Sequence, residues 1–435
     1  MKLLIRGGRV ADPTNGIDGI NDVLVENRGI AAVGHDVADT LGDDDDFQFI
    51  DATGKVVCPG FIDAHVHLRE PGFEEKEDLA SGTRAAALGG FTAVAAMPNT
   101  EPKVDSAGMV RSIKALAAEK AVARVYPIAC ITKGAKGEEL TEVADLVEAG
   151  AVALSDDGEP VANPQVMRLA LQYASMFDIP VIAHCEDRGL SGQGVMNYGR
   201  LSTILGLVGI PAEAEEAMLA RDLLLALNTG ARLHIAHLST KRGLELVRWA
   251  RESGGRVTVE VTPHHLILSE EAVHTSQYDT NTKVSPPLRT KTDLVALGQA
   301  LAGELDLIAT DHAPHHQDDK KVEYNYAPFG ISGLDTAVPM IITEFIEPGL
   351  LTWSQMVEKM SVNPASLLGV DGGSLTPGAP ADITIIDPEL EYVIDPATFA
   401  SKGKNTPFAG KEVKGDVYAT IVDGRPVVLR YQLVD

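Results

Sequence analysis

The sequence predicts a TIM-like (β/α)8 barrel joined to a small β-sandwich domain that both ends of the chain build together. Three observations lead to this fold class. Residues 58–368 alternate apolar, strand-like runs with helical stretches. Residues 1–57 and 369–435 contain short strand-like runs separated by turn residues. Polar residues recur where the strands of the middle region end, which is where barrels of this kind carry their functional groups.

The two ends of the chain are predicted to form one domain because each is rich in short strands. The N-terminal strands are expected at Leu3–Ile5, Asp22–Val25, Gly29–Val33 and Phe49–Asp51. The C-terminal strands are expected at Ala381–Asp387, Tyr392–Ile394, Val417–Val422 and Val427–Leu429. The Asp423-Gly424 pair between the last two strands is a strong hairpin signal. Residues 1–57 and 369–435 are therefore expected to pair in one β-sandwich.

The middle of the chain is predicted to be the barrel, residues 58–368. After the first strand around Phe61-Ile62, strands are expected at Phe91–Ala96, Val125–Ala129, Val152–Leu154, Val181–Ala183, Arg232–Ala236, Val257–Val261 and Leu305–Ala309. Helical patterns lie between them, for example at Glu213–Leu227 and Lys241–Glu252. A doubly wound sheet shows the same alternation, so periodicity alone leaves that layout open.

The composition is that of a globular protein and excludes several classes of partner. Of 435 residues, 45% are hydrophobic and 23% charged, and the formal net charge is −25. Nucleic acids and anionic membranes are bound by cationic surfaces, so neither is expected as a partner. The acidic run Asp43–Asp46 is expected to be a solvated loop.

The expected compartment is the cytoplasm. The Met1–Arg6 start is too short and too soon charged for a signal peptide, and no apolar run reaches about 18 residues. Cys58, Cys130 and Cys185 are odd in number and lack paired spacing, which is typical of free thiols in a reducing compartment.

The stretch from Pro59 to Gly72 carries the first candidate for metal binding. Its apolar beginning predicts a strand, and His65 and His67 are separated by one residue. Residues i and i+2 of a strand point to the same face, so the two imidazoles would project side by side. Arg69 follows at the next position on that face, near the end of the strand.

Further polar residues end the later strands of the middle region. They are Asn99, Asp156, Asp157, His184, His237 and Asp311. Four histidines and two or three aspartates on one rim are typical of a site for two zinc ions, because zinc binds imidazole nitrogen and carboxylate oxygen. One metal ion would be held by His65, His67 and Asp311, and the other by His184 and His237, with Asp157 bridging them.

The sequence resembles dihydroorotases of the longer bacterial type, within the amidohydrolase superfamily. The segments that carry the resemblance are PGFIDAHVHLREPG, GGFTAVAAMPNT, SDDG, IAHCED, AHLST, VTPHHL, PPLR, ATDHAPH, APFGISGLDT and KGKNTPF. The resemblance implies two Zn²⁺ per chain, held by His65, His67, Asp157, His184, His237 and Asp311. It implies that Arg69, Asn99 and His315 hold a substrate carboxylate and that the Phe329-Gly330 backbone contacts the substrate ring. It also makes Asp311 the general acid and base.

Two departures from related sequences bear on the site. Many members of the superfamily bridge their metals with a carboxylated lysine, but residues 152–157 contain none, so the bridge here is expected to be Asp157. The resemblance also implies a substrate-binding Asn before Pro-Pro-Leu-Arg, where this chain has Ser285. That contact is then lost, bridged by water, or made by Asn281.

These observations favour a zinc-dependent hydrolase that interconverts N-carbamoyl-L-aspartate and L-dihydroorotate, a step of pyrimidine (UMP) biosynthesis. Residues Gln317–Pro328 are a candidate lid over the site. One alternative is a hydantoinase, dihydropyrimidinase or allantoinase, which would not need Arg69 and Asn99 for a carboxylate. The other is an inactive scaffold for aspartate transcarbamoylase, which all four retained metal histidines argue against. A homodimer and an aspartate transcarbamoylase partner for the active enzyme are left open.

Overall fold

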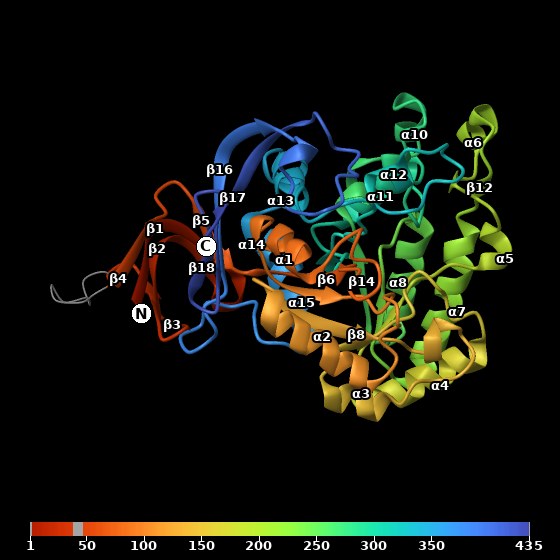
Figure 1. Ribbon diagram of the computed structural model, residues 1–435, viewed down its shortest axis with the longest axis horizontal. Helices are drawn as coiled ribbons and strands as arrows, with labels where there is room; N and C mark the ends of the chain where they lie inside the picture. The colour runs from red at the N-terminus through yellow and green to blue at the C-terminus, as the bar shows by residue number, and fades with distance from the viewer. Residues whose placement is uncertain (1, 38–46, 435) are drawn as a thin grey trace.

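The computed structural model describes residues 2–37 and 47–434, and two sheets organise them (Figure 1). Eight parallel strands form the first sheet, in the order β15-β14-β13-β10-β9-β8-β7-β6. A parallel bridge between Val66 and His312 brings the two edges of this sheet together. The predicted barrel is confirmed, and the doubly wound layout is excluded. The Asp43–Asp46 run lies outside the described residues.

The barrel strands follow the predicted runs closely. They are β6 (Phe61–Val66), β7 (Phe91–Ala96), β8 (Arg124–Ala129), β9 (Ala153–Leu154), β10 (Val181–Ala183), β13 (Leu233–Ile235), β14 (Val257–Val261) and β15 (Leu307–Ile308). Every residue of β6, β7 and β10 is buried. Strands buried on both faces have near-continuous apolar sequences, which is why their positions were predictable.

Helices cover the outside of the barrel (Figure 1). Those between successive strands are α1 (Leu79–Leu88), α2 (Ala107–Lys120), α3 (Val143–Ala149), α4 (Pro164–Ser175), α7 (Glu213–Thr229), α8 (Lys241–Glu252) and α11 (Lys291–Ala300). After β15 the chain forms α13 (Ala337–Ile341), α14 (Trp353–Val357) and α15 (Asn363–Leu368). Asp78 and Thr290 begin α1 and α11 with capping boxes, which satisfy backbone N–H groups that a helix start leaves unpaired. Among the described residues, no helix is long and apolar enough to cross a membrane.

Shorter helices and strands stand at one end of the barrel. They are α5 (Arg188–Ser191), α6 (Arg200–Leu205), α9 (Pro263–Ile267), α10 (Glu271–Thr275), α12 (Gln317–Lys320) and the pair β11 (Met196–Asn197) and β12 (Gly209–Ile210). Figure 1 shows α5, α6 and α10 projecting at the side away from the two chain ends, with α12 lying inward of them near α11 in this view. These elements belong to the loops that follow barrel strands, so they surround the opening where the polar strand-end residues lie.

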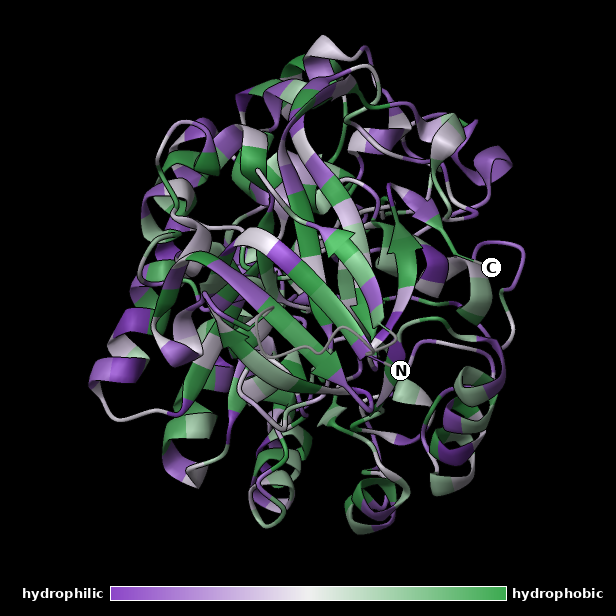
Figure 2. Cartoon of the chain, turned by 90° about the vertical axis from the view of Figure 1, so that its left-hand side faces the viewer, coloured by the Kyte–Doolittle hydropathy of each residue, from purple (hydrophilic) through white to green (hydrophobic). Residues whose placement is uncertain are grey.

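The second sheet is built from both ends of the chain. Its strands are β1 (Lys2–Asp12), β2 (Ile17–Glu26), β3 (Gly29–Gly34), β4 (Phe47–Asp51), β5 (Val56–Pro59), β16 (Ile383–Val393), β17 (Glu412–Val422), β18 (Arg425–Leu429) and β19 (Gln432–Leu433). β5 lies between β1 and β16 and joins the N-terminal strands to the C-terminal ones. Buried and less buried residues alternate along β17, and Figure 2 shows hydrophobic stretches along the strands at this end of the molecule. Asp423 and Gly424 turn between β17 and β18 with positive φ angles, as the hairpin signal predicted.

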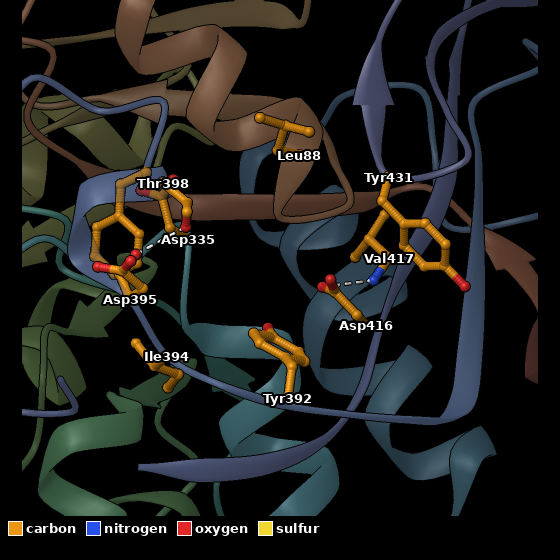
Figure 3. A pocket seen from close by; sticks show the side chains of 10 residues that line it. Leu88, Asp335, Tyr392, Ile394, Asp395, Thr398, Asp416, Val417 and Tyr431 are labelled. Atoms are coloured by element: carbon orange, nitrogen blue, oxygen red, sulfur yellow. Dashed lines mark hydrogen bonds between the residues drawn. The ribbon is translucent and has the colours of Figure 1, made fainter. Parts of the chain in front are cut away.

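A polar cavity of about 180 Å³ lies where the second sheet meets the barrel (Figure 3). Leu88 at the end of α1, Asp335, Tyr392 and Asp416 are among its lining residues. None of the residues predicted for the metal or substrate site lines it. The predicted site lies in a different cavity, at the open end of the barrel.

Candidate metal centre and substrate pocket

The first histidine pair is fixed in place by a buried carboxylate beneath it. Asp63 in β6 accepts a hydrogen bond from the His65 backbone N–H at 3.0 Å. It also accepts from the Thr310 N–H, at 3.2 Å from one carboxylate oxygen and 3.3 Å from the other. The backbone N–H of His67 then donates to the His312 carbonyl at 2.9 Å. The first and last barrel strands are therefore tied together where His65, His67 and Asp311 are required to meet.

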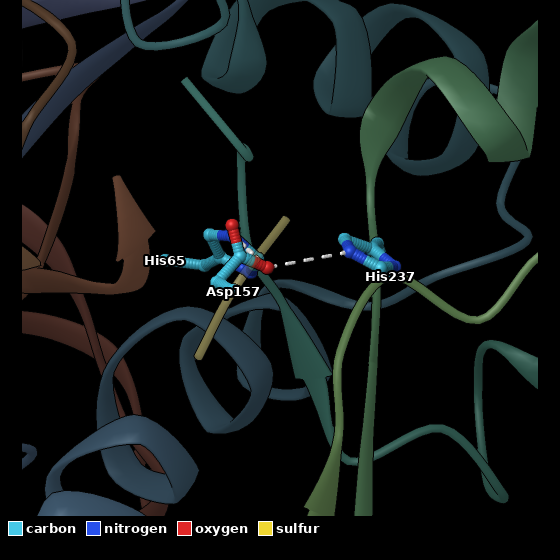
Figure 4. Close-up of side chains that lie close together, drawn as sticks. All are labelled: His65, Asp157 and His237. Carbon is cyan, nitrogen blue, oxygen red and sulfur yellow. Dashed lines mark ion pairs between the residues drawn. The ribbon is translucent and has the colours of Figure 1, made fainter. Parts of the chain in front are cut away.

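Asp157 lies at the centre of the four histidines. Its Oδ1 is 3.5 Å from His65 Nε2, and 3.7 Å from both His184 Nδ1 and His237 Nε2. Its Oδ2 is 3.5 Å from His67 Nε2. Figure 4 shows the carboxylate between the rings of His65 and His237. Each carboxylate oxygen thus faces a different part of the cluster, as a bridging ligand requires.

Asp156 and Asp157 are adjacent, but their side chains make different contacts. Asp156 Oδ1 accepts hydrogen bonds from the backbone N–H groups of Ile131 and Thr132, at 2.8 and 3.1 Å. Its other oxygen accepts from the Thr132 hydroxyl. Asp156 is therefore bound to the loop after β8, which leaves Asp157 to face the histidines.

Asp311 approaches the cluster from the last strand. Its Oδ1 is 3.1 Å from His67 Nε2 and 3.5 Å from His65 Nε2. Burial alone would raise the pKa of Asp311, but the charge of His65 and the hydrogen bond from His67 outweigh it and lower that pKa to about 2. The carboxylate is therefore ionised at neutral pH.

The donor set fits metal ions. His65, Asp157 and His237 form one group of ligand atoms within 4.8 Å of one another, and His65, His67 and Asp311 form another. Among the described residues, buried His65 Nε2 and Asp157 Oδ1, which lie 3.5 Å apart, have no hydrogen-bond partner, which is costly unless another group such as a metal ion contacts them. Burial opposes protonation of His65, yet the carboxylates of Glu260, Asp157 and Asp311 raise its pKa well above the usual value. This cluster therefore has the negative charge and the unpaired atoms that a cation would satisfy.

The grouping differs in one respect from the predicted division into two ligand sets. His65 belongs to both groups of ligand atoms, because it lies between Asp157 and Asp311. His184 belongs to neither group, but its Nδ1 lies 2.9 Å from His237 Nε2. The assignment of individual ligands to the first or second metal ion stays a prediction.

Three polar residues orient the histidines from outside the cluster. Glu260 in β14 is fully buried; its Oε1 lies 2.6 Å from His65 Nδ1 and accepts from the His237 backbone N–H at 3.1 Å. Its Oε2 lies 3.0 Å from Nε2 of His234. Asn99 Oδ1 lies 2.9 Å from His67 Nδ1, and Glu186 Oε2 lies 3.4 Å from His184 Nε2. A histidine that donates from one ring nitrogen presents the other as a lone pair, which a metal ligand requires.

Sequence reasoning did not identify Glu260 as a residue of this site. The signal was present: a charged residue inside the buried run Val257-Thr-Val-Glu-Val261 needs a partner, since buried charges are almost always paired.

The predicted substrate residues line a cavity of about 250 Å³ beside the cluster. The lining includes all six of them, Arg69, Asn99, Ser285, His315, Phe329 and Gly330. It also includes five of the six predicted ligands, His67, Asp157, His184, His237 and Asp311. Ser285 lines the cavity, and Asn281 is not among the lining residues. The cavity thus joins the metal-binding side and the predicted substrate-binding side.

Arg69 reaches this cavity by a different route from the one predicted. β6 ends at Val66, so Arg69 is not on the strand, and its φ of 63° turns the chain out of the extended conformation. Its Nε donates to the Pro314 carbonyl at 3.3 Å. Burial lowers the pKa of the guanidinium to about 10, which still leaves it charged at neutral pH.

His315 lines the cavity with a neutral ring. Its Nε2–H donates to the Phe329 carbonyl at 2.8 Å, while buried Nδ1 has no hydrogen-bond partner in the part of the chain that the structure describes. Burial first, and the charge of Arg69 second, lower the pKa of His315 to about 2, so the ring is neutral. A neutral ring that donates from Nε2 accepts a hydrogen bond at Nδ1.

Two lysines anchor residues 317–328, the candidate lid, although the residues that line the cavity include none of this segment. Lys320 donates to the carbonyls of Thr280 and Pro328, at 3.1 and 2.7 Å. Lys283 donates to the carbonyls of Tyr324 and Asn325, at 2.9 and 3.0 Å. Both lysines are buried, so residues 317–328 are anchored at several points.

Comparisons with known proteins identify the family. A model described as "Dihydro-orotase-like" matches residues 54–243, and a model of the amidohydrolase family matches residues 325–428. A protein of Pelotomaculum thermopropionicum named dihydroorotase is 56% identical, over 98% of this chain and 99% of that protein. One of Caldanaerobacter subterraneus with the same name is 52% identical, over 99% of this chain and 98% of its own. The chain belongs to the dihydroorotase family.

Solved structures of other cyclic-amide hydrolases share the fold. An L-hydantoinase (dihydropyrimidinase) from Arthrobacter aurescens has a TM-score of 0.89 at 25% identity, covering 100% of this chain and 97% of that one. A dihydropyrimidinase from Brevibacillus agri has a TM-score of 0.86, also at 25% identity, covering 100% and 96%. The identity to these proteins is less than half of that to the dihydroorotases, so the likeness establishes relatedness of fold.

Proposed function

We propose that this protein is a zinc-dependent dihydroorotase, which interconverts N-carbamoyl-L-aspartate and L-dihydroorotate in pyrimidine biosynthesis in the cytoplasm. The observation that carries the proposal is a charged arginine in the same cavity as a cluster of metal-ligand side chains. Family membership at 56% identity over nearly the whole chain supports the same substrate. A homodimer and an aspartate transcarbamoylase partner stay predictions.

Two zinc ions are proposed to be held by His65, His67, His184 and His237 together with Asp157 and Asp311. When bound, such ions polarise a carbonyl oxygen and make water reactive near neutral pH. The unpaired His65 Nε2 and Asp157 Oδ1 support this assignment, as does His237 Nε2, which lies 3.7 Å from the same Asp157 oxygen. Glu260, Asn99 and Glu186 keep three of the rings in the orientation in which their other nitrogen faces the cluster.

Asp311 is proposed to move the proton. Its Oδ1 faces His65 and His67, and the residue lines the substrate cavity. An ionised carboxylate at this position can take a proton from the attacking water. It would then pass that proton to the ring nitrogen as the amide bond breaks.

Arg69 and Asn99 are proposed to bind the substrate carboxylate. Asn99 uses Oδ1 for His67, which leaves its amide N–H groups to donate. A charged guanidinium suits a carboxylate because it donates from several N–H groups in one plane. His315 contributes differently: its Nδ1 accepts the ring N–H that neighbours the carboxylate, since a neutral ring in this state has no proton to offer there.

The alternative within the same chemistry is a hydantoinase or dihydropyrimidinase, whose fold this chain shares. Hydantoin and dihydrouracil carry no carboxylate, so neither makes use of a buried arginine at Arg69. The alternative of an inactive scaffold does not account for four histidines and two aspartates gathered in one buried cluster, in which His65 Nε2 and Asp157 Oδ1 lack a hydrogen-bond partner among the described residues.

The test is turnover of dihydroorotate beside dihydrouracil, hydantoin and allantoin, with metal content measured on the same sample. We expect about two zinc ions per chain and a strong preference for dihydroorotate. His65→Ala should lose metal and activity. The matched change His316→Ala removes an exposed histidine and should alter neither. Preference for an uncharged ring, or an active protein without transition metal, would overturn the proposal.

A further inference from the structure

Asn405 lies far along the chain from the barrel strands but contacts the wall of the substrate cavity. It belongs to the segment between β16 and β17, in the C-terminal part that contributes to the second sheet. The side chain is buried, with 4% of its surface exposed. Its Oδ1 accepts the backbone N–H of His315 at 3.1 Å, and its Nδ2 donates to the carbonyl of Gly330 at 3.0 Å. One amide therefore joins two residues that line the cavity.

The two residues it joins stand on neighbouring stretches of chain. His312 and Ile331 form a parallel bridge, and the Ala313 N–H donates to the Ile331 carbonyl at 2.7 Å. The His315 ring reaches across to the Phe329 carbonyl at 2.8 Å. Asn405 makes a second connection between the same two stretches, from the His315 N–H to the Gly330 carbonyl. Its amide consequently sets the distance between the backbones of His315 and Gly330, and the position of the His315 ring depends on that distance.

Close packing leaves this wall little freedom to adjust. Gly330 has a φ of 122°, and a Cβ there would stand 2.7 Å from Ala313 Cβ and 3.2 Å from His315 Nε2. A Cβ on Gly403 would stand 2.5 Å from Pro314 Cβ and 2.8 Å from Asn405 Oδ1. The C-terminal segment thus lies directly against the loop that carries His315, at distances that only glycine allows.

The segment around Asn405 is itself anchored. Ser332 donates from its hydroxyl to the Gly403 carbonyl at 2.8 Å and to Asn405 Oδ1 at 3.2 Å. The backbone N–H of Ser332 donates to the Asn405 carbonyl at 2.8 Å. The Asn405 side chain is therefore fixed by its neighbours and is not free to follow the wall if the wall moves.

We propose that Asn405 is a positioning residue for substrate binding, which holds His315 and the Phe329-Gly330 backbone at the spacing that the substrate ring requires. An amide is suited to this task because one end accepts from an N–H and the other donates to a carbonyl. The proposal rests on the proposed dihydroorotase activity. It assigns to the C-terminal part of the chain a direct influence on the substrate side of the site, and none on the metal ligands.

The test compares Asn405→Ala with the wild-type enzyme on dihydroorotate. Two buried backbone groups lose their partners, so the wall relaxes, and KM should rise about 10- to 100-fold while kcat changes less than about threefold. Zinc content and the pH profile of kcat should stay unchanged. Asn405→Asp keeps the acceptor for His315 but faces the Gly330 carbonyl with a second oxygen, so its KM should rise at least as much.

The matched control is Asn363→Ala. Asn363 Nδ2 donates to the Asp306 carbonyl at 2.8 Å, at the opposite end of β15 from the site. This change should lower the melting temperature in a similar way and leave KM unaltered. If Asn405→Ala does not fold, Ser332→Ala loosens the same amide without removing it, and its KM should rise about two- to fivefold.

A folded Asn405→Ala enzyme with unaltered KM would overturn the proposal, as would equal losses in both parameters accompanied by loss of zinc. An unaltered KM for Ser332→Ala, where only that variant folds, would do the same. These results differ from those expected if the proposed function is wrong, because the wild-type enzyme itself would then not turn over dihydroorotate.

Discussion

The metal side and the substrate side of the cavity are built in different ways. The side chains proposed to bind metal stand within strands or up to three residues beyond them: His65 in β6, His184 after β10 and Asp311 after β15. The substrate side is made of loops, around Arg69 and His315, whose positions depend on groups far away in the chain. The barrel strands therefore fix the metal side. The substrate side depends on hydrogen bonds from distant parts of the chain to its loops.

Backbone conformation marks the border between the two sides. Arg69, His237 and Asp311 all have positive φ values, 63°, 34° and 47°. Residues other than glycine rarely adopt this conformation, and they keep it where the surrounding structure holds them. Each of the three stands just after a barrel strand, where the chain turns its side chain into the cavity. These strained turns bring side chains of the metal side and of the substrate side into the same cavity.

The comparison predicts its largest effect at Asp311, which belongs to both sides. Asp311→Asn keeps the shape and one ligating oxygen, so much of the zinc should remain bound. The variant has no carboxylate to move the proton, and kcat should fall by roughly 10²–10⁴-fold. Single-turnover kinetics together with metal analysis would measure both quantities. Near-normal kcat would assign proton transfer to another group.

A change confined to the substrate side should discriminate between substrates. Arg69→Ala leaves a substrate carboxylate uncompensated in a buried site, which costs about 2–5 kcal/mol. The value of kcat/KM for dihydroorotate should then fall by roughly 30- to several-thousand-fold. Zinc content should stay intact, and any turnover of dihydrouracil, which has no carboxylate, should change little. Equal losses on both substrates would mean that Arg69 supports the structure of the site and not its specificity.

The same difference explains what was predictable from the sequence. The proposed metal ligands follow apolar strands, so local patterns identified the barrel, its strands and the residues that meet on its rim. The position of Arg69 was predicted less well, because a single positive φ turns it off the strand. The choice of Asp157 over Asp156 depended on the resemblance, because the local pattern of the doublet does not show that Asp156 binds the loop after β8.

Two residues were missed for a common reason. Glu260 is 195 positions from His65, and Asn405 is 90 positions from His315. Neither contact follows from local periodicity, because each is formed only when distant strands and loops are brought together. A lone charged or amide residue in a buried run indicates that a partner exists, but it does not say which one.

The smallest of the expected effects is on the metal side, and it tests whether that side depends on support from outside the cluster. Glu260→Gln keeps an oxygen for His65 Nδ1–H and for the His237 N–H, but it removes the negative charge that makes His65 a stronger ligand. Metal affinity, measured by competition with a chelator, should fall about 10- to 100-fold, the range for such outer partners. The fully loaded enzyme should keep its kcat within a few fold, since Glu260 touches no substrate.

The control for that variant changes Thr258, which contacts His234 on the ring nitrogen opposite Glu260. His234 Nδ1 lies 2.8 Å from the Thr258 hydroxyl, and its Nε2 faces Glu260. Thr258→Val keeps the size of the side chain and leaves the contact between Glu260 and His65 in place, so metal affinity should stay at the wild-type value. If both variants weakened metal binding equally, the packing around His234 would be responsible, and the metal side would depend on distant contacts as much as the substrate side does.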